Sequence, residues 1–268
     1  MRIISFEELK ELQLDMLCKI DEFCRNNNIN YTLAYGTLIG AIRHKGYIPW
    51  DDDIDVAMPR PDYNKFITTF NGVYEKYYVM APDINANFYA PYANVCDNRT
   101  LLEEFDNSHR GIPMGIKIDV FPIDGTPDSE ADYKNLVSTI KMYKYILTSK
   151  RNHYRFSCSI SSIKSLIVRL ISLFYKYEDV QKKIIKKCSG FPFNSSKWVD
   201  TVCFPVYKNT RVPKSFFDDY VDVDFEGKKF KSLKEYDLYL RAIYGDYLQL
   251  PPKDKQVPHH GFTAYWKD

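Results

Sequence analysis

The chain has 268 residues, and its 37 Lys and Arg nearly balance 35 Asp and Glu, which gives a formal net charge of +2. A chain of this length can bury a sizeable core, either as one large domain or as a domain with an insertion. Its six cysteines show neither C-x-x-C spacing nor paired clusters. The sequence therefore indicates neither a zinc site nor a disulfide framework, and we expect a reducing, cytoplasmic location.

The first predicted element is a helix that packs on the core. Residues 5–8, Ser-Phe-Glu-Glu, fit a capping box, and apolar residues follow at helical spacing until the polar stop at 26–28. Charges stand where a signal peptide needs an apolar core, so we expect no secretion signal.

An acidic stretch at residues 51–55 carries four carboxylates in five positions. If residues 51–58 form a strand, alternation places Asp51, Asp53 and Asp55 on one face and the intervening apolar residues toward the core. Carboxylates about 7 Å apart on one face repel and raise one another's pKa. A divalent cation with oxygen ligands, such as Mg²⁺, relieves this repulsion. The alternative interpretation is a solvated acidic turn.

A turn of small residues precedes this strand. Gly36 and Thr37 stand between a predicted strand at 31–35 and a short predicted helix at 38–44. Glycine lets the backbone approach a phosphate closely, and the N–H groups that open a helix bind anions. A small-residue turn, a short helix and an Asp-x-Asp strand are the layout of nucleotidyltransferase-type folds.

A second acidic position follows in an alternating run at residues 115–122, where Lys117, Asp119 and Phe121 share one face of a predicted strand. Asp119 is thus the one acid of this strand, whereas we expect Asp124 in a loop or a cap. The pattern between the two acidic strands predicts a helix over 62–70 with Asp62 as N-cap, and strands over 77–80, 92–97 and 100–105.

Residues 36–66, GTLIGAIRHKGYIPWDDDIDVAMPRPDYNKF, closely resemble the LicD family of bacterial phosphocholine transferases. The fukutin-type sugar-alcohol phosphate transferases are related, and the family is assigned to the nucleotidyltransferase superfamily. The resemblance extends to IKIDVFPID and to YDLYLRAIYGDYLQLPP, so it touches both ends of the chain. It implies an α+β fold, with a nucleotidyltransferase-like mixed sheet and flanking helices.

The resemblance also implies a reaction and its residues. A phosphoalcohol, most simply phosphocholine, would pass from CDP-choline or another CDP-alcohol to a hydroxyl of a surface glycan, such as lipopolysaccharide or teichoic acid, or of its lipid-linked precursor. CMP would leave. Asp53, Asp55 and Asp119 are the predicted catalytic residues and the ligands of Mg²⁺, with Mn²⁺ as the alternative ion. Predicted to bind substrate are Gly36, Thr37, Arg43, His44, Lys45, Trp50 and His260. Tyr35, Tyr47 and Trp50 could provide aromatic faces for a quaternary ammonium group or could simply pack.

A basic segment interrupts the resemblance. Residues 134–187 contain 13 Lys and Arg against two acids, a net charge of +11. We therefore divide the chain into a catalytic core at 1–132, a mainly helical basic insertion at 133–202, and a C-terminal portion at 203–268 that packs back on the core. Residues 160–177 are too interrupted by charge to cross a membrane. They could form a core helix or one that lies on anionic lipid, which leaves open a peripheral contact with the inner face of the membrane.

The last third is predicted to form a hairpin over 221–230 that turns at Glu226 and Gly227. A second capping box at 232–235 should open a helix that ends at Gly245.

Two other functions remain open from the sequence. The fold could transfer the nucleotide itself to a small molecule or sugar, with pyrophosphate as the product in place of CMP. Alternatively, the chain could be a non-enzymatic glycan- or membrane-binding scaffold, although the three retained aspartates argue against a dead site. Nucleic acid is not an expected partner, because the basic residues lie away from the acidic motif and no RNA-binding signature is present.

Overall fold

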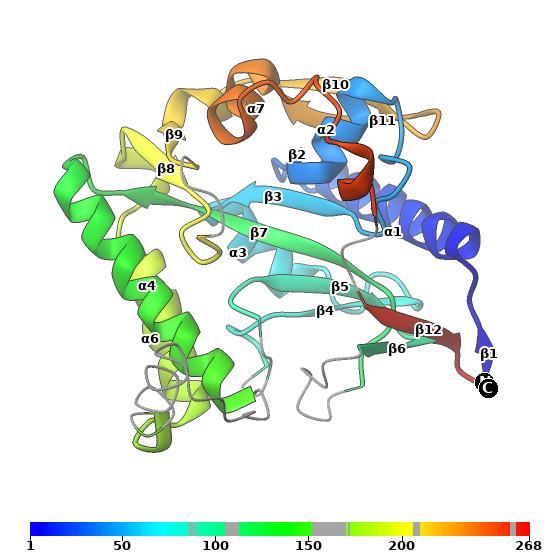
Figure 1. Ribbon diagram of the computed structural model, residues 1–268, viewed down its shortest axis with the longest axis horizontal. Helices are drawn as coiled ribbons and strands as arrows, with labels where there is room; N and C mark the ends of the chain where they lie inside the picture. Colours follow the sequence, from blue (N-terminus) through cyan, green and yellow to red (C-terminus); the bar gives the residue numbers. More distant parts are fainter. Residues whose placement is uncertain are drawn as a thin grey trace.

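The structure is a computed structural model that describes residues 1–85, 88, 90–104, 113–151, 170, 172–205, 210–257 and 261–268. Helices surround a curled mixed sheet, which confirms the predicted α+β class (Figure 1).

The central sheet has seven strands in the order β2-β3-β7-β5-β4, and β8 and β9 continue it from the far end of β7. Only β3 and β7 run parallel, and the other pairs in this sheet are antiparallel. This pairing sets Asp55 directly opposite Asp119. The strands are β2 Thr32–Leu33, β3 Asp55–Pro59, β4 Tyr77–Met80, β5 Ala93–Asp97, β7 Lys117–Thr126, β8 Trp198–Asp200 and β9 Val212–Pro213.

Two helices, α1 (Phe6–Asn26) and α3 (Arg60–Thr69), pack together against the sheet. The ring of Phe23 meets the rings of Phe66 and Phe70 edge to face, with centroids 5.8 and 5.1 Å apart. The predicted capping box at Ser5 is present, so the first helix is confirmed at both ends.

A separate group of elements lies beside β2, at the top of Figure 1. It consists of α2 (Tyr35–Arg43), the hairpin β10 (Tyr220–Phe225) and β11 (Lys228–Leu233), and α7 (Tyr236–Tyr244). The hairpin is confirmed, and its two turn residues, Glu226 and Gly227, have φ values of 49° and 71° as a tight two-residue hairpin turn requires.

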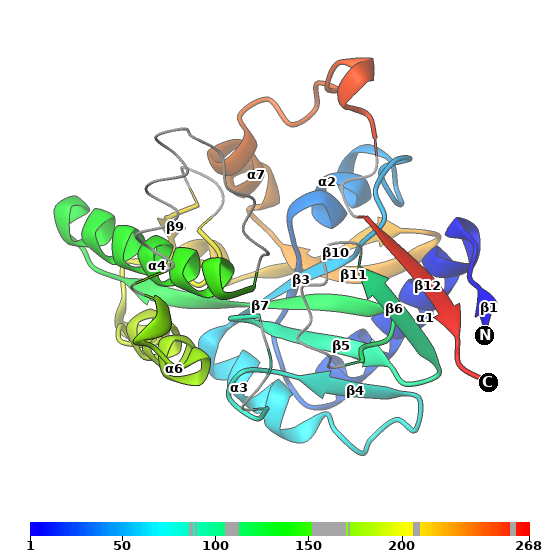
Figure 2. The same cartoon turned by 60° about the horizontal axis from the view of Figure 1, so that its bottom comes forward.

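The ends of the chain meet in a small antiparallel sheet of order β1-β12-β6. Its strands are β1 Arg2–Ile3, β12 Phe262–Trp266 and β6 Thr100–Glu104. Figure 2 shows the two termini side by side, and the Met1 amino group lies 2.9 Å from a carboxylate oxygen of Asp268.

The basic segment contributes α4 (Glu130–Arg151) and α6 (Tyr177–Cys188), which pack on each other at the lower left of Figure 1. Most of the helix predicted over 160–177 lies outside the described residues. Among the helices of the described ranges, none is long and apolar enough to cross a membrane. Short 3₁₀ turns occur at Phe193–Ser195, Lys214–Phe217 and Lys253–Lys255.

The predicted acidic strand is shorter than expected. It begins at Asp55, and residues 51–54 form an irregular loop that follows a turn closed by the Asp51 N–H on the Ile48 carbonyl at 2.9 Å. The preceding helix starts earlier than predicted, at Tyr35. Gly36 and Thr37 consequently belong to the first turn of α2 and not to a loop before it.

Three other predicted details are wrong. Pro59 and not Asp62 caps α3, because Pro61 fits inside the first turn, where its missing N–H is not needed. Ser232 lies within β11, and α7 starts after Glu235 without a side-chain cap. Asp124 is a buried residue of β7 that pairs with Asp200 of β8, and its carboxylate accepts two hydrogen bonds from Arg60, at 2.6 and 2.7 Å.

Candidate active site

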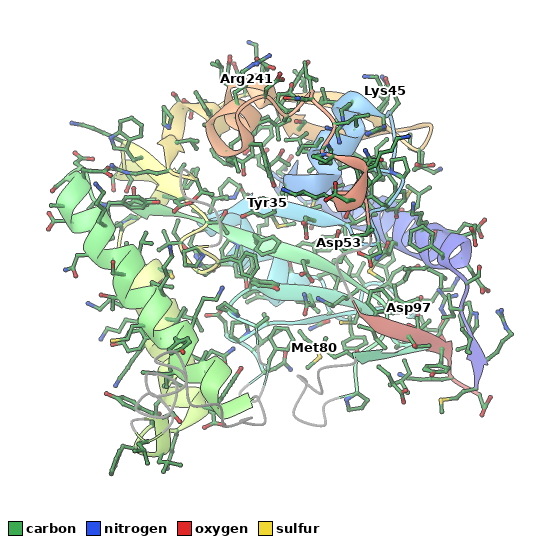
Figure 3. The ribbon with its side chains drawn as sticks, viewed as in Figure 1. Tyr35, Lys45, Asp53, Met80, Asp97 and Arg241 are labelled. Carbon is green, nitrogen blue, oxygen red and sulfur yellow. The ribbon has the colours of Figure 1, made fainter. Side chains whose placement is uncertain are left out.

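A cavity of about 880 Å³ opens where the parallel strands β3 and β7 begin, beside α2. One part of its wall is acidic, and Asp51, Asp53, Asp55 and Asp119 contribute to it. In Figure 3, Tyr35 and Asp53 lie near the middle of the molecule, below α2 and α7.

Asp55 is the first residue of β3, and its carboxylate lies in unfavourable surroundings for a negative charge. Its backbone N–H donates to Thr37 Oγ1 at 2.8 Å, so the first turn of α2 fixes the start of β3. Burial raises the pKa of Asp55 well above its ordinary value, and the nearby charges of Asp53 and Asp119 raise it further. The ionised carboxylate is thus unfavourable here unless a cation comes close.

Asp119 is oriented by two neighbours. Asn94 lies opposite it on β5 and donates Nδ2 to Asp119 Oδ1 at 2.5 Å, while Lys117 Nζ lies 2.8 Å from the same oxygen. The other oxygen, Oδ2, has no donor among the described residues. Its lone pairs can therefore serve a ligand in the cavity.

The loop before β3 brings more carboxylates to the same place. Oxygens of Asp51, Asp52 and Asp53 lie within 4.8 Å of one another. Asp52 does not line the cavity and is buried, with Gln13 Nε2 donating to its carbonyl at 3.1 Å. Asp51 approaches Gly36 so closely that a Cβ on Gly36 would stand 2.5 Å from Asp51 Oδ2. Gly36 therefore leaves space for an acid, and the predicted contact with phosphate is not tested by this geometry.

This donor set fits a hard divalent cation. The cavity offers carboxylate oxygens from two neighbouring strands and a loop, and no imidazole or thiol among the described residues lines it. Oxygen-only sites of this kind suit Mg²⁺ or Mn²⁺ better than zinc. The raised pKa of Asp55 is a second sign of fit, because a bound cation would offset both the burial and the nearby negative charges that raise it.

The predicted cationic residues separate in the structure. Arg43 lines the cavity and donates Nη1 to the Tyr247 carbonyl at 2.7 Å and Nε to His44 Nε2 at 2.9 Å. His44 and Lys45 do not line it, and Lys45 lies at the upper edge of Figure 3, away from Asp53. His260 lies outside the described residues.

A second part of the wall is aromatic. The rings of Tyr92, Phe121 and Phe204 contact one another with centroids 4.3 to 5.4 Å apart, and Tyr35 meets Phe121 edge to face at 5.2 Å. We call Tyr35, Tyr92, Phe121 and Phe204 the aromatic wall. All four line the cavity, as does Trp50.

Sequence reasoning missed most of the aromatic wall. Alternation in β7 already placed Phe121 on the same face as Asp119, so that signal was available. No signal in the sequence indicated Phe204, because it lies far along the chain from the other residues of the aromatic wall. Tyr47, which was expected near Trp50, does not line the cavity, and its hydroxyl donates to the Lys10 carbonyl at 3.1 Å.

Comparison with known proteins identifies the family of this chain. The family model described as "LicD/FKTN/FKRP, nucleotidyltransferase domain" matches residues 28–123, which include the acidic loop, β3 and Asp119. The chain is 33% identical over 264 residues to the lipopolysaccharide cholinephosphotransferase LicD of Haemophilus influenzae, and the match covers 96% of this chain and 97% of that protein. Uncharacterized proteins of Rickettsia typhi and Rickettsia prowazekii are each 46% identical, over 56 and 54 residues; each match covers 20% of this chain and 18% and 20% of those proteins.

Proposed function

Because the chain belongs to the LicD family, we propose that it transfers phosphocholine from CDP-choline to a hydroxyl of a cell-surface glycan or its lipid-linked precursor and releases CMP. The Haemophilus relative is named as a lipopolysaccharide cholinephosphotransferase, and this name supports phosphocholine transfer as the type of reaction. The observation that carries the proposal is the pairing of Asp55 with Asp119 at a cavity whose wall is part acidic and part aromatic.

In the proposed reaction the acceptor oxygen attacks the phosphorus that bears choline, and the bond from that phosphorus to CMP breaks. Asp53, Asp55 and Asp119 would hold Mg²⁺ or Mn²⁺, which when bound neutralises charge on the diphosphate. Lys117 and Asn94 keep Asp119 in place, and one of the cavity carboxylates accepts the proton of the attacking hydroxyl.

The aromatic wall is the proposed site for the choline end of the donor. A trimethylammonium group has no N–H to donate, so aromatic faces are the groups that recognise it. The wall lies in the same cavity as the carboxylates, so one molecule can reach both. Replacing Phe204 with Leu should raise KM for CDP-choline about tenfold, as expected for losing one partly desolvated cation–π contact. KM for CDP-glycerol, whose alcohol is uncharged, should change little, and an equal change for both donors would contradict this role.

Product analysis tests the reaction itself. Purified protein would be incubated with Mg²⁺, a set of CDP-alcohols and a glycan acceptor, and the released nucleotide would be measured with and without acceptor. Acceptor-dependent CMP release, with CDP-choline preferred, is the expected result. Pyrophosphate release from a nucleoside triphosphate would favour nucleotidyl transfer, and no turnover with any donor would favour a binding protein.

We also propose a peripheral contact with the membrane. Next to α6, the side chains of Leu170, Leu173 and Phe174 are 54%, 72% and 89% exposed. Lys176 and Lys182 are exposed close by in the sequence. Exposed apolar side chains beside cations are what an anionic lipid surface binds.

A further inference from the structure

A second cavity, of about 690 Å³, lies between α4 and α6 and shares no lining residue with the candidate active site. We call it the α4–α6 groove. From α6 it is lined by Lys183, Lys186 and Lys187, which fall on one side of the helix because they are three and four residues apart. Asp132 is the one acid among its lining residues.

Within the described residues, the protein compensates these three lysines only slightly, through Lys183 Nζ, which lies 4.8 Å from the centroid of the Tyr175 ring. None of the ion pairs within the described part of the chain involves Lys183, Lys186 or Lys187, although exposed lysines elsewhere pair with acids, as Lys229 does with Asp224 at 2.6 Å. Like charges three or four residues apart destabilise a helix. A favourable interaction with the helix C-terminus offsets part of this cost, but it does not require the charges to line a cavity.

The opposite wall offers neutral polar groups. Asn135, Thr139 and Tyr143 follow one another at four-residue intervals along α4, so they form one stripe that faces the lysines across the groove. The amide of Asn135 and the hydroxyl of Tyr143 make no hydrogen bond with other described residues. Leu136 and Phe191 add apolar surface to the groove. The groove thus combines cations, hydrogen-bonding groups and apolar surface in a space larger than a phosphate ion.

From these features we infer that the α4–α6 groove binds a phosphate group carried on a hydroxyl-bearing molecule, either a phosphorylated sugar or a lipid headgroup. The lysines take the phosphate through charge-assisted hydrogen bonds, and the α4 stripe takes neighbouring hydroxyl groups. This inference does not depend on the reaction at the other cavity.

Binding measurements on the full chain test the inference. The probes are glucose 6-phosphate, monomeric short-chain phosphatidylglycerol below its micelle concentration, and inorganic phosphate, each titrated at low and high salt. Replacing Lys183, Lys186 and Lys187 together with Gln should weaken binding of the better organic probe by at least about tenfold, because the charge-assisted hydrogen bonds to its phosphate are lost. The control variant replaces Lys134, Lys141 and Lys182 with Gln. These lysines belong to the same two helices but lie outside the groove, so the variant changes the net charge by the same amount. Its affinity for the organic probe should be nearly that of the wild type.

A steric variant separates the groove from a diffuse basic surface. Thr139→Trp fills the groove without altering charge and should also abolish binding, with thermal unfolding as the check on folding. A response to glucose 6-phosphate alone identifies a sugar phosphate as the ligand type, and a response to the lipid alone identifies a headgroup. The inference is overturned if neither organic probe binds at low salt, if inorganic phosphate binds as tightly as both, or if the two lysine variants weaken binding equally.

Discussion

Asp55 is a residue whose surroundings oppose its own charge. Replacing it with Asn should lower turnover at least about a hundredfold, because a ligand and a charge are lost where electrostatic stabilisation is greatest. Without metal, the free energy of unfolding should stay the same or rise by about 1–2 kcal/mol, because a buried repulsive charge is removed. Chemical unfolding in a chelator and an activity assay measure the two effects. Asp179→Asn, which changes an exposed acid outside the cavity, is the matched control.

If Asp55→Asn instead lost stability without metal and kept activity, the acidic cluster would be structural. The same substitution therefore separates a metal site from a structural network.

Asp119 should belong to the same metal site as Asp55. Mg²⁺ that binds only the folded state stabilises it by mass action, about 2.7 kcal/mol at a hundred times the dissociation constant. Asp119→Asn should show a clearly smaller rise in Tm with Mg²⁺ than the wild type. Asn94→Ala, which removes the donor to Asp119 Oδ1, should show an intermediate rise. Equal rises in all three proteins would exclude Asp119 from the site.

At this scale the sequence predicted the acids better than their partners. Alternation in two strands was enough to place Asp55 and Asp119 on related faces, because side-chain direction in a strand has a period of two. Nothing in a single sequence reports that Asn94 lies opposite Asp119, since strand order is decided by the whole sheet. The backbone of Tyr35, with φ of 46°, was equally unpredictable, because bulky residues rarely adopt that region.

The first turn of helix α2 contains Gly36, a residue type that helix propensity disfavours. Alanine is favoured over glycine inside a helix by about 1 kcal/mol, so Gly36→Ala would ordinarily stabilise α2. Here the new Cβ would stand 2.5 Å from Asp51 Oδ2, so the acid must move. We expect turnover to fall about tenfold or more, since small displacements of an active site are costly. The double variant Gly36→Ala with Asp51→Ala should unfold at a higher temperature than Gly36→Ala alone; the absence of this recovery would show that the contact is not limiting.

The capping box of α1 also joins three elements. Glu8 accepts hydrogen bonds from Arg2 of β1 and Trp266 of β12, and these bonds lower the pKa of its carboxyl from 4.5 to about 2. Because the folded pKa is below the unfolded one, the contribution of Glu8 to stability is fully present above pH 4.5 and is lost as pH falls toward 2. Unfolding free energies of the wild type and Glu8→Gln should therefore differ most near neutrality and converge in acid. Glu11→Gln, at an exposed position of the same helix, should show no such convergence.

Across elements, long periodic patterns were predicted well and short boundaries were not. The first helix and the β10–β11 hairpin follow from caps, turn residues and alternation within one segment. The acidic strand was predicted too long because the local pattern continues through residues 51–54, whereas the fold bends the chain there. Asp124 was misplaced for a similar reason, since its partner Arg60 comes from another element.

For the whole molecule, the basic segment is the part that the motifs carrying the family resemblance do not reach. Helix α6 places three lysines in the groove, and Leu173, which precedes this helix, has an exposed side chain. The basic segment carries a net charge of +11 in a nearly neutral chain, so it contributes a positive potential at the protein surface. The acidic cavity beside β3 and β7 and the lysine-lined α4–α6 groove are thus separate sites.

The positive charge of the basic segment predicts that the protein approaches anionic lipid with Leu173, Phe174 and the lysines near them. Each lysine that reaches the surface contributes roughly 1 kcal/mol, and the exposed side chains of Leu173 and Phe174 add an apolar contact, so two signals act together. The protein should co-sediment with anionic but not neutral liposomes. Binding should be lost in 1 M salt, where the Debye length is about 3 Å. Two double variants should each reduce binding to liposomes: Leu173→Ser with Phe174→Ser, and Lys176→Glu with Lys182→Glu. Turnover on a short soluble acceptor should stay the same in both. Because Lys176 and Lys182 lie outside the α4–α6 groove, this experiment tests the membrane contact independently of the groove. If both double variants sediment with liposomes as the wild type does, the basic segment has an ordinary solvated surface.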